Sequence, residues 1–120
     1  MRTGRKITGG KYIRARKGKL FEKKGQPRIV KLGENRAKFI RVMGGNLKRV
    51  SLTSNTANII VNGKAKKAKI KNVIETPANK FLARQNILIK GAIIDTDLGK
   101  ARITNRPSQD GQVQAVIIKA

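Results

Sequence analysis

Short apolar runs alternate with clusters of turn residues over the last three quarters of the chain. The first four runs are residues 28–32 (RIVKL), 37–43 (AKFIRVM), 47–53 (LKRVSLT) and 56–61 (TANIIV). Strands of about five to eight residues, with turn signals about every ten residues, favour a barrel or a sandwich. We therefore predict an all-β fold, a small β-barrel of about six to eight strands with hairpins and at most one short helix.

Two of the turns have a strong hairpin signature. Gly44-Gly45-Asn46 separates the second and third runs, and its glycines adopt positive φ freely. Asn62-Gly63 is the strongest short hairpin signal, and it leads into a return strand over 65–75 (AKKAKIKNVIE). Side chains alternate between the two faces of a strand. One face of this return strand is predicted to hold Ala68, Ile70 and Ile74, and the other Lys67, Lys69 and Lys71.

The C-terminal third continues the pattern. Residues 86–90 (NILIK) and 92–95 (AIID) flank Gly91, which predicts a bulge or bend within one long strand. Asp97-Leu98-Gly99 predicts a turn before a strand over 100–104 (KARIT).

Two further elements complete the prediction. Asp110-Gly111 indicates a hairpin turn before a last strand over 112–119 (QVQAVIIK). One short helix is predicted over 77–85, with Thr76 as its N-cap and Pro77 at its first position.

The first quarter of the chain differs in charge and in apolar content. The whole chain has 29 Lys and Arg, 6 Asp and Glu and a net charge of +23. Residues 1–31 contain 12 of these basic residues and one acid, together with five glycines. Such a segment buries too little apolar surface to offset its ordering entropy. We therefore predict an extended basic arm over 1–27, ordered only against a partner, and a β-barrel domain over 28–120. Pro27 marks the boundary.

Several classes of chemistry are excluded by composition. The chain has no Cys and no His, so it has no disulfide, no thiolate metal site and no histidine base. No phosphate-binding glycine-loop motif occurs. Asp95 and Asp97 could hold a cation, but among so many cations we interpret them as ionised groups paired with Lys100 or Arg102. We predict no enzyme activity, no cofactor, no metal and no small-molecule substrate.

The expected location is cytoplasmic. No apolar run approaches the roughly 20 residues that span a bilayer, and the basic N-terminus lacks the apolar region of a signal peptide. We therefore expect no membrane partner.

The charge predicts a nucleic-acid partner. Arg and Lys neutralise phosphates and release counterions, and glycines let backbone N–H groups approach phosphate. In the arm, Thr8–Lys11 is expected to form a phosphate-contacting turn. The candidate RNA-binding residues of the arm are Arg2, Arg5, Lys6, Thr8, Gly9, Gly10, Lys11, Tyr12, Arg14, Arg16, Lys17, Lys19, Lys23 and Lys24. The alternative is a flexible, solvated tail.

Two aromatic residues in the arm have two interpretations. Tyr12 and Phe21 could stack on unpaired bases, or they could pack back onto the barrel and tether the arm.

A second group of candidates lies on the predicted domain. The hairpin around Gly44-Gly45-Asn46 could enter a groove, or it could be only a tight turn with solvated charges. The lysines of 65–75 could bind RNA or only protect a strand edge against aggregation. The candidates of the domain are Arg28, Arg41, Gly44, Gly45, Asn46, Lys48, Arg49, Lys67, Lys69, Lys71 and Arg102.

The charge alone does not choose between DNA and RNA. The chain has no helix-turn-helix, zinc finger or basic zipper, and it lacks the aromatic strand motif of an RNA recognition sheet. A small barrel with a long basic arm fits shape recognition of folded RNA.

Three sequence blocks are distinctive: Arg5-Lys6-Ile7-Thr8-Gly9-Gly10-Lys11, Arg41-Val42-Met43-Gly44-Gly45-Asn46 and residues 90–118. They resemble the archaeal–eukaryotic "eight-e" family of small-subunit ribosomal proteins, in its short archaeal form. The resemblance covers nearly the whole chain. It implies a β-barrel core, direct binding to small-subunit ribosomal RNA beside neighbouring ribosomal proteins, and no catalysis. The long insertion of eukaryotic members is absent here. The rival hypothesis is a nonspecific DNA-compacting protein, and an RNA-modifying enzyme is a distant third.

Overall fold

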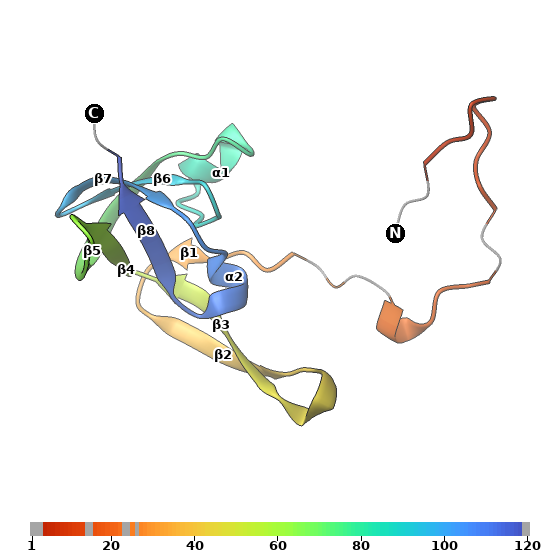
Figure 1. The fold of residues 1–120 in the computed structure, drawn as a ribbon, viewed down its shortest axis with the longest axis horizontal. Coiled ribbons are helices and arrows are strands. Elements are labelled where there is room, and N and C mark those ends of the chain that lie inside the picture. Colours follow the sequence, from red (N-terminus) through yellow and green to blue (C-terminus); the bar gives the residue numbers. More distant parts are fainter. Residues whose placement is uncertain (1–3, 14–15, 23–24, 26, 119–120) are drawn as a thin grey trace.

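Five strands close into a small barrel. The structure is a computed structural model, which describes residues 4–13, 16–22, 25 and 27–118. The barrel strands are β4 (Thr56–Val61), β5 (Lys64–Glu75), β6 (Ile93–Thr96), β7 (Gly99–Ile103) and β8 (Val113–Ile117). Neighbouring strands pair antiparallel in chain order, and a parallel pairing of β4 with β8 closes the barrel (Figure 1).

Three more strands form a separate sheet beside the barrel. They are β1 (Lys31–Leu32), β2 (Arg36–Arg41) and β3 (Leu47–Ser54), in the order β1-β3-β2. The β2–β3 hairpin projects away from the barrel (Figure 1), and its tip contains the 3-10 turn η2 (Met43–Gly45). The all-β prediction is confirmed: the described residues form eight strands, divided between the closed barrel and this sheet. The helices are α1 (Lys80–Arg84), α2 (Pro107–Asp110) and the 3-10 turn η1 (Leu20–Glu22).

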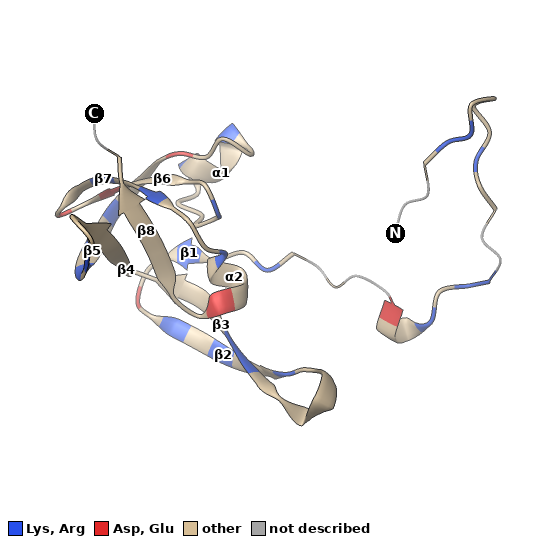
Figure 2. Ribbon diagram, in the orientation of Figure 1, with Lys and Arg blue, Asp and Glu red and all other residues tan. Residues whose placement is uncertain are grey.

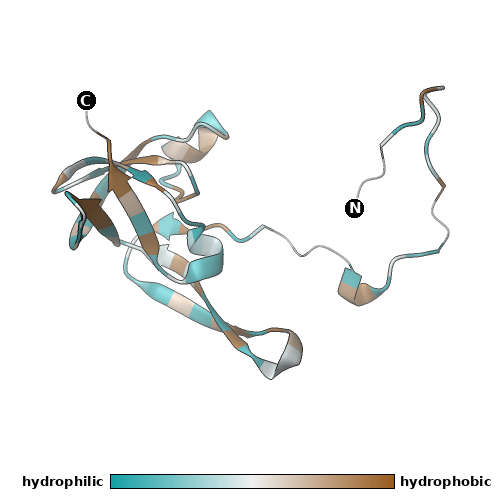
Figure 3. Cartoon of the chain, in the orientation of Figure 1, coloured by the Kyte–Doolittle hydropathy of each residue, from teal (hydrophilic) through white to brown (hydrophobic). Residues whose placement is uncertain are grey.

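The core lies inside the barrel. Inward positions alternate small and large side chains: Ala57 and Ile59 on β4, Ala101 and Ile103 on β7, with at most 1% of each exposed. Alternation of this kind fills the narrow interior of a small barrel without voids. Figure 3 shows the hydrophobic residues on the barrel strands and the hydrophilic ones along much of the N-terminal segment. Val30 is the first buried residue among those described.

Both strong hairpin predictions are confirmed. Asn62 and Gly63 have φ of 49° and 77°, the positive values that a type I′ turn requires, and they join β4 to β5. Gly44 and Gly45 have φ of 77° and 76° between β2 and β3.

The predicted faces of the 65–75 strand are correct only in their first half. Ala68 and Ile70 are buried and the lysines beside them are exposed, as expected. The register of β5 with β6 then shifts between Ile70 and Asn72 and again between Val73 and Glu75. Because a shift of one residue exchanges the two faces, Val73 is buried and Ile74 is 45% exposed.

The prediction of one long strand through Gly91 is wrong. Residues 86–88 pair with the first sheet: the Leu88 amide donates to the Val30 carbonyl at 2.8 Å. Residues 93–96 are β6 of the barrel. The chain turns at Gly91 (φ 84°) because the two halves hydrogen-bond to different sheets. The run 28–32 is likewise shorter than predicted, since only Lys31–Leu32 is a strand.

The predicted helix begins later than Thr76. Asn79 is the N-cap of α1, and its side-chain oxygen accepts from the Phe81 amide at 3.0 Å. Thr76 is buried, and its hydroxyl donates to the Asn79 carbonyl in the turn that precedes the helix. Pro77 lies in that turn and not at the first helical position.

The Asp110-Gly111 pair does not form a two-residue hairpin turn. Pro107–Asp110 is the short helix α2, and Gly111 is its C-cap with φ of 64°. Strands β7 and β8 do pair antiparallel, but the connection between them contains this helix. Proline at the start and glycine just past the end are the usual boundaries of a helix.

Candidate nucleic-acid interface

The glycine-rich segment near the N-terminus forms a closed turn. The Lys6 amide donates to the Gly10 carbonyl at 2.9 Å, and the Gly9 amide donates to the Lys6 carbonyl at 2.9 Å. Arg5 and Lys11 face each other across the turn, and Arg5 Nη1 donates to the Gly9 carbonyl at 2.9 Å. Gly9 has φ of 81°, which explains a glycine there. The turn holds three cations, at positions 5, 6 and 11, on a short exposed loop.

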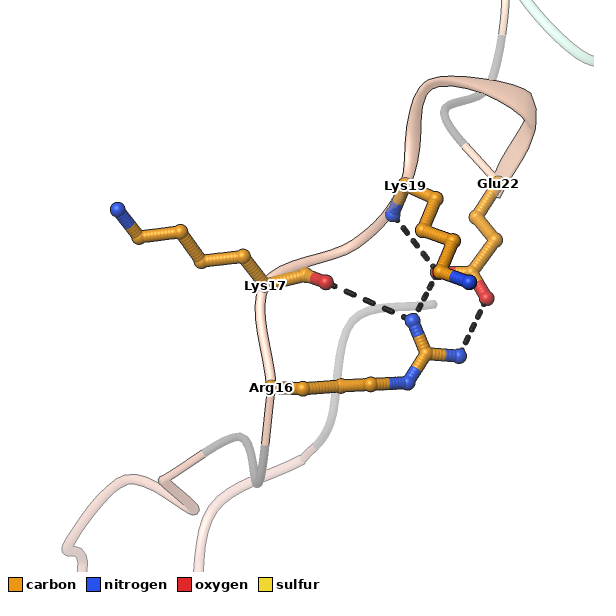
Figure 4. Close-up of polar contacts among 4 residues, drawn as sticks. All are labelled: Arg16, Lys17, Lys19 and Glu22. Carbon is orange, nitrogen blue, oxygen red and sulfur yellow. Dashed lines mark hydrogen bonds and ion pairs between the residues drawn. The ribbon is translucent and has the colours of Figure 1, made fainter.

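A carboxylate organises the next part of the arm. Glu22 accepts from Arg16 Nη2 at 2.6 Å, from Arg16 Nη1 at 3.1 Å and from the Lys19 amide at 3.0 Å (Figure 4). The Arg16 guanidinium, followed by the Lys19 amide, holds the pKa of Glu22 below its usual value. Arg16 is therefore engaged within the chain, whereas the Lys17 ammonium group points away from this cluster (Figure 4).

Both aromatic rings of the arm are exposed. Tyr12 is 52% and Phe21 79% exposed, so neither ring is packed into the core. Lys6 Nζ lies 5.7 Å from the Tyr12 ring centroid and Lys19 Nζ lies 5.9 Å from that of Phe21. Each ring thus has a cation nearby and at least half of its residue's surface exposed, which leaves it accessible to a base.

The β2–β3 hairpin presents a mixed apolar and basic face. Phe39 lies opposite Arg49, and Arg41 lies opposite Leu47, so these four side chains share one face. All four are exposed, and Met43 at the tip is 93% exposed. The tip glycines and Asn46 are exposed as well.

Three candidates of the domain are held by contacts within the chain. Lys48 Nζ donates to Gln109 Oε1 on α2, and Arg28 Nη1 donates to the Ser108 carbonyl at 3.2 Å. Lys71 Nζ lies 3.4 Å from Asp97 Oδ1. The predicted pairing of Asp97 with Lys100 or Arg102 is therefore wrong, because the β5–β6 bulge brings Lys71 to this turn.

The remaining strand candidates are exposed. Lys67 and Lys69 project from one face of β5, and Arg102 projects from β7 opposite Val116 of β8. Figure 2 shows the basic residues of β2 and β5 and those spread along the N-terminal segment. Arg2, Arg14, Lys23 and Lys24 lie outside the described residues.

A polar cleft lies where the three-stranded sheet meets the outer face of the barrel. Its volume is about 220 Å³, and β2, β3, β4 and β5 all contribute to its lining. Its cations are Arg36, Arg49 and Lys67. Three lining residues, Arg36, Ser51 and Asn58, were not among the candidates predicted from the sequence. For Asn58, the alternation of the strand could have indicated this position. Asn58 is a polar residue that points outward between the inward-facing Ala57 and Ile59.

In the part of the chain that the structure describes, no group of three His, Cys, Asp or Glu side chains could hold a metal ion. No helix there is long and apolar enough to cross a membrane.

Comparison with known proteins assigns the family. Residues 1–118 match the family described as "Ribosomal protein S8e". The chain belongs to this family. The resemblance of the three sequence blocks is therefore confirmed. In the structure, these blocks are the glycine turn of the arm, the tip of the β2–β3 hairpin, and the segment from Lys90 through β8.

The S8e family assignment agrees with individual relatives over almost their whole length. Each of three is called "Small ribosomal subunit protein eS8". The one from Sulfurisphaera tokodaii is 48% identical over 118 residues, which cover 96% of this chain and 92% of the relative. The one from Methanoregula boonei is 45% identical over 116 residues, 95% of this chain and 93% of the relative. The one from Nanoarchaeum equitans is 42% identical over 120 residues, 98% of this chain and 94% of the relative.

Proposed function

We propose that this protein is a structural constituent of the small ribosomal subunit, where it binds ribosomal RNA and contacts neighbouring ribosomal proteins. Its family is structural and not enzymatic, and its archaeal relatives carry the name of a small-subunit protein. The cytoplasmic ribosome is then its location. The net charge of +23 supplies the attraction to RNA phosphates.

The observation that carries the RNA-binding part is the distribution of exposed cations outside the core. Every described residue from 4 to 22 is exposed. In this segment, the Arg16–Glu22 pair is the one ion pair among the described residues. The other described cations of this segment form no ion pair within the described part of the chain, which favours a polyanion as their partner.

We assign different tasks to the two parts of the chain. Residues 1–27 act as the arm that follows RNA phosphates, with the glycine turn at Thr8–Lys11 presenting cations at close range. Residues 28–120 form the domain that positions the arm, and its β2–β3 hairpin makes a second RNA contact. Arg41 and Arg49 share the exposed face of that hairpin.

Deletion of residues 1–27 tests the arm. We expect the truncated protein to keep its far-UV circular dichroism spectrum, because its core begins at Val30. Its affinity for transcribed small-subunit ribosomal RNA should fall. The slope of log K against log salt should become shallower by roughly 0.9 for each phosphate contact that is lost. Unchanged affinity and slope would show that the arm makes no phosphate contact.

A competition experiment separates the proposed function from nonspecific DNA compaction. The full chain, bound to labelled small-subunit ribosomal RNA, is challenged with unlabelled RNA and with duplex DNA at equal phosphate concentration. We expect the RNA to compete at much lower concentration, because shape recognition depends on the RNA fold. Equal competition by duplex DNA would support the DNA-compacting alternative.

A further inference from the structure

The cleft between the two sheets has the features of a binding site. Its cations come from three strands: Arg36 from β2, Arg49 from β3 and Lys67 from β5. Neither ion pair in the described part of the chain involves any of the three. Three like charges around one concavity repel one another, so an anion between them would be stabilising.

The base of the Arg49 side chain packs against Gly111. A Cβ atom added at Gly111 would lie 2.7 Å from Arg49 Cγ, so the arginine stem rests directly on the glycine backbone. Gly111 and Arg49 both line the cleft. The close contact holds the base of the side chain in place and reduces the conformational entropy that Arg49 loses on binding.

Hydrogen bonds among polar side chains stabilise the cleft wall. Ser54 Oγ donates to Asn35 Oδ1 at 3.1 Å, and Asn35 Nδ2 donates to Thr56 Oγ1 at 3.2 Å. In contrast, no side-chain hydrogen bond within the described ranges engages Ser51 or Asn58, although both line the cleft and Ser51 is buried. These two side chains retain donors and acceptors for a ligand.

The size and lining of the cleft identify the class of ligand. A volume of about 220 Å³ is below the ~300 Å³ at which small-molecule pockets usually begin, so a free cofactor is too large. No aromatic ring lines the cleft, so a stacked base is disfavoured. Cations beside hydroxyl and amide groups suit a phosphate with its attached sugar.

We propose that this cleft binds one phosphate–ribose unit of an RNA strand. Arg36, Arg49 and Lys67 neutralise the phosphate, while Ser51 and Asn58 hydrogen-bond the 2′-hydroxyl. The cleft thereby favours RNA over DNA, because only RNA has that hydroxyl. The strand continues in both directions, along the hairpin face with Arg41 and along β5 toward Lys69. This proposal rests on the RNA-binding function proposed above.

The test measures the preference of the full chain for RNA over DNA. The probes are a 12-nucleotide single-stranded RNA and the DNA of the same sequence, and the variants are Ser51→Ala, Asn58→Ala and Arg49→Gln. We expect Ser51→Ala or Asn58→Ala to reduce the RNA-to-DNA affinity ratio by about fivefold, the effect of one hydrogen bond. Asn58 is only half-buried, so its variant serves if Ser51→Ala fails to fold.

The arginine variant tests the phosphate contact. Arg49→Gln should weaken RNA and DNA binding alike by about tenfold. It should also make the salt slope shallower by roughly 0.7, the value for one phosphate of a single strand. The matched control is Arg84→Gln on α1, which removes the same charge outside the cleft and should leave the ratio and the slope unchanged.

The possible outcomes distinguish the two proposals. If the wild-type chain binds ribosomal RNA but no cleft variant changes the ratio or the slope, the cleft assignment is wrong and the proposed function stands. That result is also expected if the cleft receives an acidic segment of a neighbouring protein. If the wild-type chain does not bind ribosomal RNA, both proposals are refuted.

Discussion

Gly111 is the position at which we expect an added methyl group to be most costly. Its φ of 64° is left-handed, and alanine in that conformation costs about 1–2 kcal/mol. The new Cβ would also lie 2.7 Å from Cγ, 3.1 Å from Cδ and 3.2 Å from Cβ of Arg49. Displacing a packed stem costs about 1–3 kcal/mol more. We therefore expect Gly111→Ala to lower the free energy of unfolding by about 2–5 kcal/mol.

Gly63→Ala is the matched control for this substitution. Gly63 has φ of 77° but no atom within 4 Å of an added Cβ, so only the backbone cost of about 1–2 kcal/mol applies. Both substitutions restrict the unfolded chain equally, so that effect cancels between them. The difference between the two variants measures the contact with Arg49.

A double-mutant cycle confirms the source of the difference. In an Arg49→Ala background Cγ and Cδ are gone and only Cβ remains near the added methyl group, so the cost of Gly111→Ala should fall most of the way to that of Gly63→Ala. Urea unfolding followed by far-UV circular dichroism is the appropriate assay, because the chain has no Trp and its single Tyr lies in the arm. Equal losses for the two glycine variants, or no coupling between positions 49 and 111, would refute the reasoning.

Three further predictions concern the barrel, the arm and the helix α1. Ile70→Ala should lower the free energy of unfolding by about 2–5 kcal/mol, because Ile70 is only 6% exposed. Ile74→Ala should lower it by less than half as much, because Ile74 is 45% exposed. Similar losses of stability in urea unfolding would contradict a bulge between the two residues. An NMR titration should give the Glu22 carboxyl a pKa below its usual value. The contacts of Glu22 therefore stabilise the arm at pH above the unfolded-state pKa, and this stabilisation is lost as the pH falls through the folded-state pKa. Arg16→Gln should raise the titration midpoint of Glu22, and an unchanged midpoint would exclude the Arg16–Glu22 pair as the cause of the shift. Asn79→Ala should destabilise by about 0.5–2 kcal/mol through loss of the N-cap, and full retention of stability on thermal unfolding would contradict that role.

Turns with a demanding backbone conformation were predictable from the sequence. Asn62-Gly63 and Gly44-Gly45 require positive φ, which few residues adopt, so their identities locate the turns directly. The inward alternation of Ala57 and Ile59 was also readable, because the period of a strand is fixed by its backbone. These are local constraints, and each acts within a few residues.

Several of the failed predictions depend on partners distant in sequence. Ile74 is exposed because β5 shifts register against β6, whose residues are about twenty positions away. The run around Gly91 is divided because residue 88 pairs with residue 30, which no pattern between 86 and 95 reveals. Asp110-Gly111 matched a hairpin signal, but the chain forms a short helix that begins at Pro107, and Gly111 is the C-cap of that helix.

The candidate site shows the same division. The sequence identified basic residues and exposed glycine turns. Its charge pointed to a nucleic acid, and its basic arm and family resemblance pointed to RNA. It gave no sign that Lys48, Arg28 and Lys71 would be held by Gln109, Ser108 and Asp97. Nor did it indicate that Arg36, Arg49 and Lys67, spread over thirty-two positions of chain from residue 36 to residue 67, would line one cleft.

By itself the sequence determined the sign of the charge, its concentration in the first quarter, the all-β fold and the two tight hairpins. Composition sets long-range electrostatics, and single residues set backbone preference, so neither needs a folded neighbour. Only the tertiary structure decided which strands close the barrel, where the bulge falls in β5, which cations are neutralised and where the polar cleft forms. Those features follow from non-local pairing, in which the register of one strand depends on the closure of all five.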